Sequence, residues 1–204
     1  MYLSKLILNE KNSQIYRDLG NAHALHQRIM QGFPDETRSN PRADWNILYR
    51  HEPDSHVTLV QSTITPDWNR LPSGYLACNE VKSLALMLDG LNVGKTLRFR
   101  LKANPSKRES KTTKLIPLTA YEDQITWLER QGASHGFEVR GVEVMPTPDL
   151  YGRKSTSSAP IKIFSILYQG VLEIKKKDTF ILGLQQGIGR GRSYGCGLLS
   201  LMRL

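Results

Sequence analysis

The sequence contains only two cysteines in 204 residues, and they stand far apart. Cys78 and Cys196 fit neither a disulfide framework nor the clustered spacing of a zinc site. Both have apolar neighbours in the sequence, so we expect them to be small core residues rather than reactive thiols.

Long apolar runs are also missing. No segment approaches the roughly 20 apolar residues that a membrane-spanning helix requires. The opening MYLSKLILN lacks the charged-then-apolar profile of a signal peptide. A membrane surface would attract a basic protein, but we find no basic amphipathic helix to lie on it. These absences predict a cytoplasmic protein without a membrane partner.

What the chain does have is positive charge. Lys and Arg total 28 against 19 Asp and Glu, which makes the formal net charge +9. A polyanion such as nucleic acid is the natural partner, because each neutralised phosphate releases condensed counterions. A cationic surface that only keeps the protein soluble is the alternative.

The second half of the chain shows the clearer pattern of elements, in the order β-α-β-β-α-β of a ferredoxin-like unit. Its first helix carries a capping box, with Thr119 as the N-cap and Glu122 as its partner. The expected elements are a strand at 97–102, a helix at 118–131, strands at 137–145 and 161–174, a helix from 178 and a strand at 196–201.

The first half predicts a similar order with a weaker second helix. Gly20 and Asn21 divide its helical region, and Asn21 is the expected N-cap of the second part, which Pro34 ends. The expected elements are a strand at 2–8, helical segments at 12–19 and 22–33, strands at 45–50 and 57–63, an ambiguous segment at 66–75 and a strand at 84–88. The chain is therefore predicted to be an α+β protein of two tandem ferredoxin-like βαββαβ domains, residues 1–92 and 93–204.

Two of the five histidines, His23 and His26, lie close together on one predicted helix. Their i, i+3 spacing puts both on one face, with His23 in the first turn, where the helix dipole disfavours a protonated imidazole. An imidazole is a natural acid or base for RNA cleavage, in which the substrate supplies its own 2′-hydroxyl nucleophile. Structural histidines are the simpler alternative. A metal site would need the glutamate of H-E-x-x-H, which His-Ala-Leu-His lacks, so we predict no metal and no cofactor.

A glycine-rich loop follows the last predicted helix. It precedes a strand, whereas dinucleotide-binding and Walker loops follow a strand and open a helix. With Arg190 and Arg192 interleaved, such a loop can approach a sugar–phosphate backbone closely. A helix C-cap and a tight turn would need only one or two glycines. The glycines are Gly187, Gly189, Gly191, Gly195 and Gly197.

Two further basic segments surround a predicted strand end and flank the flexible run 155–158. A-form RNA is recognised mainly through its shape and backbone, so basic loops with few aromatics suit a duplex. Aromatic stacking platforms would instead indicate single strands. The candidate RNA-binding residues are Lys102, Lys107, Arg108, Lys111 and Lys114 in the first segment, and Arg153, Lys154 and Lys162 in the second.

Several short segments along the whole chain occur together in the order found in one known family. They are residues 1–5, 25–27, 99–105, 124–130, 170–172, 185–189 and 195–201. Through them the sequence resembles the CasE family, the CRISPR repeat-processing endoribonucleases of type I-E systems. The most specific segments are Gln-Gln-Gly-Ile-Gly and Gly-Cys-Gly-Leu-Leu-Ser-Leu near the end.

This resemblance implies two ferredoxin-like (RRM-like) domains that bind the stem-loop of CRISPR repeat RNA. It implies metal-independent cleavage at the base of the stem by the 2′-hydroxyl. The enzyme is then expected to stay bound to the mature crRNA, with other Cascade subunits as partners. His26 matches the key histidine of the family, whereas His23 stands where relatives carry tyrosine. Arg153 and Lys154 match RNA contacts of a hairpin, and Arg28 is a candidate by position alone.

Two other classes of function share the basic charge and the tandem units. A pure RNA-binding module would use His26 only for packing, although RRM-type binding typically shows aromatic residues on central strands, a signature we do not find. A structural Cascade subunit would hold a crRNA made elsewhere. Cleavage of a repeat hairpin in EDTA separates both from the nuclease.

Overall fold

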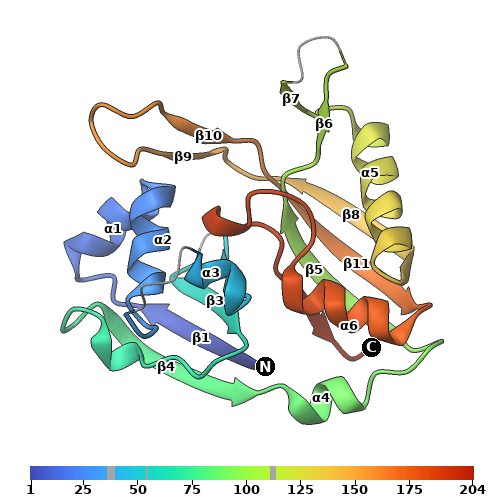
Figure 1. The fold of residues 1–204 in the computed structure, drawn as a ribbon, viewed down its shortest axis with the longest axis horizontal. Helices are drawn as coiled ribbons and strands as arrows, with labels where there is room; N and C mark the ends of the chain where they lie inside the picture. The colour runs from blue at the N-terminus through green and yellow to red at the C-terminus, as the bar shows by residue number, and fades with distance from the viewer. Residues whose placement is uncertain (36–39, 54, 111–113) are drawn as a thin grey trace.

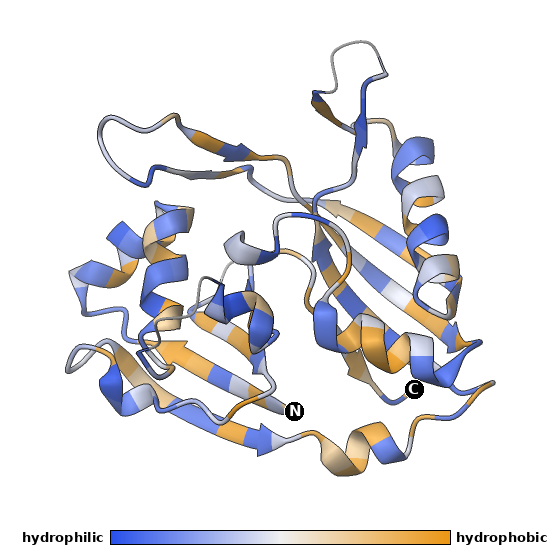
Figure 2. Ribbon diagram, viewed as in Figure 1, coloured by the Kyte–Doolittle hydropathy of each residue, from blue (hydrophilic) through white to orange (hydrophobic). Residues whose placement is uncertain are grey.

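The computed structural model describes residues 1–35, 40–53, 55–110 and 114–204. Within them the chain forms two four-stranded antiparallel sheets, each with helices on one face (Figure 1). Hydrophobic and hydrophilic residues alternate along strands of both sheets (Figure 2), which is typical of antiparallel sheets covered on one face. This arrangement confirms the predicted α+β class and the tandem ferredoxin-like order.

The first sheet has the spatial order β2-β3-β1-β4. Helices α1 (Ser13–Leu19) and α2 (Ala22–Met30) cover one face, where Leu6 of β1 packs with Leu25 and Ile29 of α2. The short helix α3 (Pro41–Asp44) precedes β2. The strands are β1 (Tyr2–Leu8), β2 (Leu48–His51), β3 (Val57–Ser62) and β4 (Leu76–Ser83).

The last strand of this sheet lies earlier than predicted. The expected strand at 84–88 is wrong, because α4 (Ala85–Asp89) occupies that segment, whose Leu, Ala and Met residues are good helix formers. β4 is an almost fully exposed edge strand, so its pairing with β1 rather than an apolar face holds it. In the described part of 66–75, only the 3-10 turn η1 (Trp68–Arg70) forms.

The two cysteines have different surroundings. Cys196 is fully buried, and its burial raises the pKa of the thiol to about 12. Cys78 lies exposed on β4, so its assignment to the core is wrong.

The second sheet has the order β12-β5-β11-β8, with α5 (Tyr121–Ser134) and α6 (Lys177–Gln186) on one face. Phe99 of β5 and Tyr168 of β11 pack with Trp127 of α5 and Phe180 of α6. Two small hairpins, β6–β7 and β9–β10, extend from this unit (Figure 1). The strands are β5 (Thr96–Ala103), β6 (Ser106–Arg108), β7 (Leu115–Pro117), β8 (Phe137–Pro146), β9 (Leu150–Gly152), β10 (Ile161–Ile163), β11 (Ile166–Ile174) and β12 (Leu199–Met202).

The predicted capping box of α5 does not form. The helix begins at Tyr121, and its N-cap, Ala120, makes no side-chain hydrogen bond. Instead the Gln124 side chain turns back and donates to the carbonyl oxygens of Leu118 (3.0 Å) and Thr119 (3.3 Å). The chain is extended through Ala120, so Thr119 stands one residue too early to cap the helix.

Arg50 of β2 joins the two sheets. Its side chain is almost completely buried and donates to the carbonyl oxygens of Arg100 (2.9 Å) and Leu198 (3.1 Å) and to Ser200 Oγ (2.8 Å). Glu52 pairs with Arg50 (2.6 Å) and also with Arg100 (2.9 Å). A guanidinium from the first sheet therefore binds the backbone of β5 and of the residue that precedes β12.

Two further contacts strengthen this interface. Gln61 of β3 donates to the carbonyl oxygen of Leu184 in α6 (2.7 Å), and Tyr49 donates to that of Ser193 (3.1 Å).

No helix in the described ranges has both the length and the apolar character needed to cross a bilayer.

Replacing Arg50 by Ala should lower the free energy of unfolding by about 3–5 kcal/mol, because Glu52 and two carbonyl groups then lose a buried donor. Denaturant unfolding measures this loss. Arg98→Ala, an exposed position on the neighbouring strand β5, should change stability by no more than about 0.5 kcal/mol. Equal midpoints for the two variants would contradict the role given to Arg50.

Candidate active site

The N-terminus of α2 is built by Asn21. Its Oδ1 accepts hydrogen bonds from the backbone nitrogens of His23 (3.0 Å) and Ala24 (3.4 Å), so the predicted N-cap is confirmed. Ala22 and Leu25 point into the core, which turns His23 and His26 toward the second unit of the chain.

Three rings meet at this place. The centroids of His23 and His26 lie 6.3 Å apart, and the ring of Tyr194 makes edge contacts with both, at 6.4 Å and 6.1 Å. Tyr194 belongs to the glycine-rich loop, about 170 positions further along the chain. The site is therefore assembled from both halves of the protein.

His26 is electrostatically unusual. Burial is the main cause that lowers its pKa from the ordinary value of 6.5 to about 4, and the nearby charges of His23 and Arg42 lower it further. At neutral pH its imidazole is uncharged and can accept a proton. The buried Nδ1 of His23 has no hydrogen-bond partner among the described residues, so this nitrogen is available to a ligand.

The glycine-rich loop uses all five of its predicted glycines. Each has a positive φ, between 75° and 91°, so the number exceeds what one cap and one turn need. The 3-10 turn η2 (Arg192–Tyr194) lies inside the loop. At Gly195 a Cβ would also come within 3.2 Å of the Tyr49 ring, so this position favours glycine.

Positive charge reaches the histidines from Arg42, which itself lies near Arg192. Arg42 of α3 is close enough to lower the pKa of His26, and Arg192 in turn lowers the pKa of Arg42, after burial. Arg192 is held by hydrogen bonds to the carbonyl oxygens of Gly189 (3.0 Å) and Gln186 (2.8 Å). Like charges held this close attract an anion such as a phosphate.

The β9–β10 hairpin rests on the start of α2 (Figure 1). The backbone nitrogen of Arg153 donates to Asn21 Oδ1 (3.2 Å), and Asn21 Nδ2 donates back to the carbonyl oxygen of Arg153 (3.4 Å). A Cβ at Gly152 would come within 2.7 Å of Asn21 Oδ1. Arg153 and Lys154 therefore follow the hairpin strand at a fixed point beside His23.

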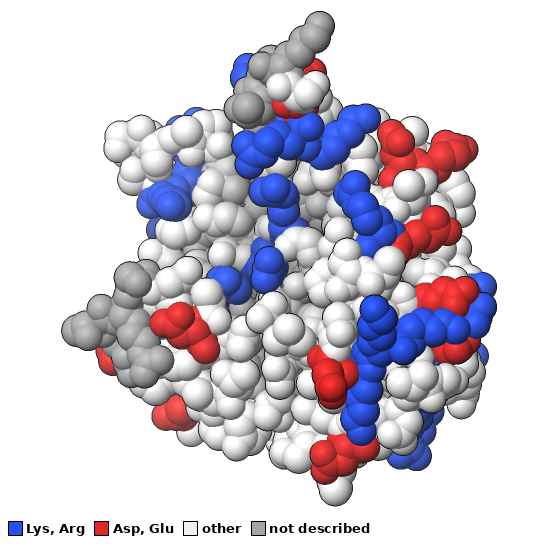
Figure 3. Space-filling model, turned by 45° about the vertical axis from the view of Figure 1, so that its right-hand side comes forward, with Lys and Arg blue, Asp and Glu red and all other residues white. Residues whose placement is uncertain are grey.

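A basic groove of about 710 Å³ lies between the β6 strand, α5 and the glycine-rich loop. It brings together four of the predicted RNA-binding residues, and it adds Arg130 and His135, which the sequence reasoning did not select. Figure 3 shows Lys and Arg side chains gathered across one face of the molecule. The groove residues are Lys107, Arg108, Arg130, His135, Arg190 and Arg192.

Other predicted residues lie outside this groove. Arg28 pairs with Asp18 (2.7 Å) and stands over the Tyr75 ring, so its guanidinium is used within the fold. Lys162 faces Asp149 (3.4 Å) on the hairpin. Lys102 is buried, and Lys111 falls outside the described residues.

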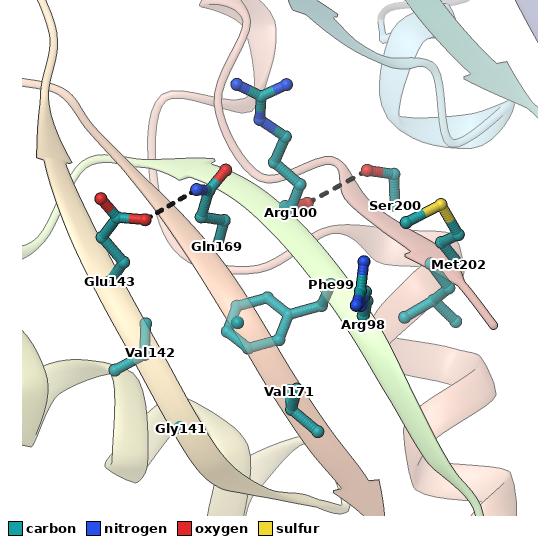
Figure 4. A pocket seen from close by; sticks show the side chains of 12 residues that line it. Arg98, Phe99, Arg100, Gly141, Val142, Glu143, Gln169, Val171, Ser200 and Met202 are labelled. Atoms are coloured by element: carbon teal, nitrogen blue, oxygen red, sulfur yellow. Dashed lines mark hydrogen bonds between the residues drawn. The ribbon is translucent and has the colours of Figure 1, made fainter. Parts of the chain in front are cut away.

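The outer face of the second sheet has a groove of about 640 Å³, in which several polar groups pair with one another (Figure 4). Gln169 donates to Glu143 (2.7 Å), and Ser200 donates to the carbonyl oxygen of Arg100 (3.3 Å). The residues that line it include no histidine. The three-ring cluster is the better candidate for an active site.

Tyr194 and Arg42 are the site residues that sequence reasoning missed. Tyr194 is the only aromatic residue in the glycine-rich run, a signal that could have selected it. Arg42 has no distinguishing pattern around it. In the described part of the chain, no group of three His, Cys, Asp or Glu side chains is arranged to hold a metal ion.

Titration of the His26 imidazole by NMR should show a pKa of about 4. In His23→Gln this pKa should rise, because one charge that opposes protonation is gone, yet stay below 6.5 because burial remains. His56→Gln, a histidine outside the cluster, should leave it unchanged. A wild-type pKa near 6.5 would show that His26 is not desolvated.

The comparisons with known proteins agree along the whole chain. A family model described as "CRISPR associated protein" matches residues 1–203. The CRISPR-associated endoribonuclease Cse3 of Thermus thermophilus is 31% identical over 215 residues, which cover 98% of this chain and 99% of that protein. The CRISPR system Cascade subunit CasE of Escherichia coli is 31% identical over 215 residues and 100% of both chains. A structure of CRISPR endoribonuclease Cse3 bound to 19 nt RNA has a TM-score of 0.88 and 30% identity, covering 99% of this chain and 100% of that one. The chain belongs to the CRISPR associated protein family and is of the Cse3 and CasE type.

Proposed function

We propose that the protein is a metal-independent endoribonuclease that cuts CRISPR repeat RNA at the base of its stem-loop and remains bound to the crRNA as a Cascade subunit. The observation that carries this proposal is the pair of histidines on α2, faced by Tyr194 beside a basic groove. The names of the relatives and the RNA-bound structure support the substrate class. The cytoplasm is the proposed compartment.

The chemistry begins with the 2′-hydroxyl beside the scissile phosphate. As its oxygen bonds to phosphorus, the neutral imidazole of His26 takes the proton, and the bond from phosphorus to the 5′-oxygen breaks. His23, the second imidazole of the cluster, assists in its protonated form by giving its own proton to the leaving 5′-oxygen, so one imidazole gains a proton as the other loses one. The products are a 2′,3′-cyclic phosphate and a 5′-hydroxyl. We assign His26 as the base because its low pKa leaves the imidazole uncharged at neutral pH.

Positive charge for the transition state comes from the protein itself. The charge of Arg42 acts on His26, and the charge of Arg192 acts on Arg42, as the lowered pKa values of His26 and Arg42 indicate. They are positioned to stabilise the extra negative charge that develops on phosphorus oxygens. Because imidazoles move the protons and guanidiniums hold the charge, the mechanism needs no metal ion.

The RNA stem is proposed to lie along the basic groove. Lys107 and Arg190 are exposed there and suit phosphate contacts along an A-form backbone. Arg153 and Lys154 would contact the end of the stem beside the histidines, where the β9–β10 hairpin is tied to Asn21.

The two sheets correspond to two domains that carry different parts of the site. We assign residues 1–92 to a domain that carries the histidines and residues 93–204 to one that carries the groove and the glycine-rich loop. The cleavage site then requires both, since Tyr194 and Arg192 come from the second.

Cleavage of a labelled repeat hairpin in EDTA tests the nuclease directly. The wild type should cut it, and His26→Ala should bind it with similar affinity but cut at least about 100-fold more slowly, the usual contribution of a general base. If His26→Ala cuts as fast as the wild type, His26 is not the base. If the wild type binds without cutting, the chain is an RNA-holding module.

Salt dependence tests the groove. Lys107→Gln and Arg190→Gln should each weaken binding and reduce the slope of log K against log salt by about 1, as expected when one phosphate contact is lost. Lys82→Gln removes the same charge from the exposed edge strand β4 and should leave the slope unchanged. Equal slopes in all three variants would show that the groove does not contact the RNA.

A further inference from the structure

A cavity of about 370 Å³ borders the three-ring cluster through Tyr194. It lies where α1, α2, the end of β2, the end of β5 and the start of the β9–β10 hairpin meet. Its volume is at the lower end of the range of about 300–1,000 Å³ that small-molecule sites occupy. Most of its lining is apolar, and Asp149, its acidic member, faces Lys162 (3.4 Å). The basic side chains of the lining are Lys102 and His51, one from each sheet.

Lys102 is the unusual member of this lining. Its side chain is only 9% exposed, and no described residue makes a hydrogen bond or ion pair with its ammonium group. Glu52, the carboxylate whose charge acts on Lys102, is engaged with Arg50 and Arg100. Its backbone is fixed, because its carbonyl oxygen accepts from the Gly197 nitrogen (2.8 Å). The ammonium is not one of the fully buried nitrogens, and Lys102 lines the cavity. A largely buried cation without a protein partner is suited to an acceptor that arrives with a ligand.

His51 adds a second polar group to the same wall. Its Nδ1 is hydrogen-bonded to Thr58 Oγ1 (3.0 Å), which leaves Nε2 for a ligand. Burial lowers the pKa of His51 to about 4, and the charge of Lys102 is the next cause. The imidazole is therefore neutral at pH 7 and its Nε2 can take the role, donor or acceptor, that the ligand requires.

The chemistry of the cavity selects one kind of ligand. A phosphate would bring its full charge among apolar side chains, where a single ammonium could not replace its hydration. A nucleobase has flat apolar faces and carbonyl or ring-nitrogen acceptors at its edge, which match the apolar lining and Lys102. Because Tyr194 lines the cavity and touches both imidazoles, a base held there keeps its own phosphodiester close to the histidines.

We propose that this cavity binds one unpaired nucleobase of the RNA substrate next to the cleaved phosphate, with Lys102 Nζ donating to an acceptor on the edge of the base. The inference rests on the proposed endoribonuclease function and adds a nucleotide-specific subsite to it. Lys102 is then a specificity-determining residue, whereas Lys107 and Arg190 contact phosphates.

An abasic scan of the unpaired nucleotides that flank the stem tests this subsite. Each abasic ribonucleotide keeps its 2′-hydroxyl and phosphate, so only the base is removed. With the wild type, one position should lower single-turnover cleavage about 10-fold or more, the effect of losing a hydrogen bond to a charged group. With Lys102→Met, the intact hairpin should already be cut that slowly, and the abasic change at that position should add little.

Two variants control for other causes. Lys102→Met replaces an unpaired buried charge by an apolar side chain of similar length, so its unfolding midpoint should be unchanged or higher. Lys107→Met makes the same substitution in the basic groove, and with it the sensitive position should keep its full abasic effect. Leu19→Trp, which fills the cavity from α1, should behave as Lys102→Met does.

The possible failures are distinct. If the wild type cuts the hairpin but every abasic effect is the same in Lys102→Met, the nucleobase subsite is wrong and the endoribonuclease stands. If adenosine monophosphate binds the RNA-free protein in a Lys102-dependent manner while the abasic scan is flat, the cavity takes a free nucleotide instead. If the wild type does not cut at all, the proposed function itself fails.

Discussion

The buried guanidinium of Arg50 is the interaction on which the site depends. The histidines lie on a helix of the first sheet, and their aromatic and cationic neighbours lie on a loop that follows the last helix of the second. Arg50 binds carbonyl groups of β5 and of Leu198, which precedes β12, and Tyr49 beside it donates to the glycine-rich loop. Without this interface, the α2 face and the loop would have no fixed relation to each other.

Desolvation links the chemistry of the site to the fold. Burial lowers the pKa values of His26, His51 and Lys102. The overall charge of the chain is also strongly positive. Positive groups gathered around a site favour an incoming polyanion. Burial first, and then the charges of His23 and Arg42, keep His26 uncharged, so it can accept a proton beside groups that attract the polyanion.

Sequence patterns predicted the elements that local chemistry decides. The Asn21 cap, the strand and helix order of the second half and the need for all five loop glycines follow from residue types at fixed offsets. Two predictions about these elements failed, each for its own reason. β4 has no apolar alternation, because its pairing with β1 holds an otherwise exposed edge, and the Thr119 cap fails because the chain stays extended through Ala120.

The sequence by itself determined the net positive charge, the shared helix of His23 and His26 and the glycine-rich loop, because each depends on composition or on neighbours a few residues away. Only the tertiary structure decided that Tyr194 meets both imidazoles, that Arg28 is tied to Asp18 and that Lys102 is buried beside a cavity. Those outcomes depend on the packing of two sheets against each other, and burial and proximity across such an interface are set by contacts that no local pattern records.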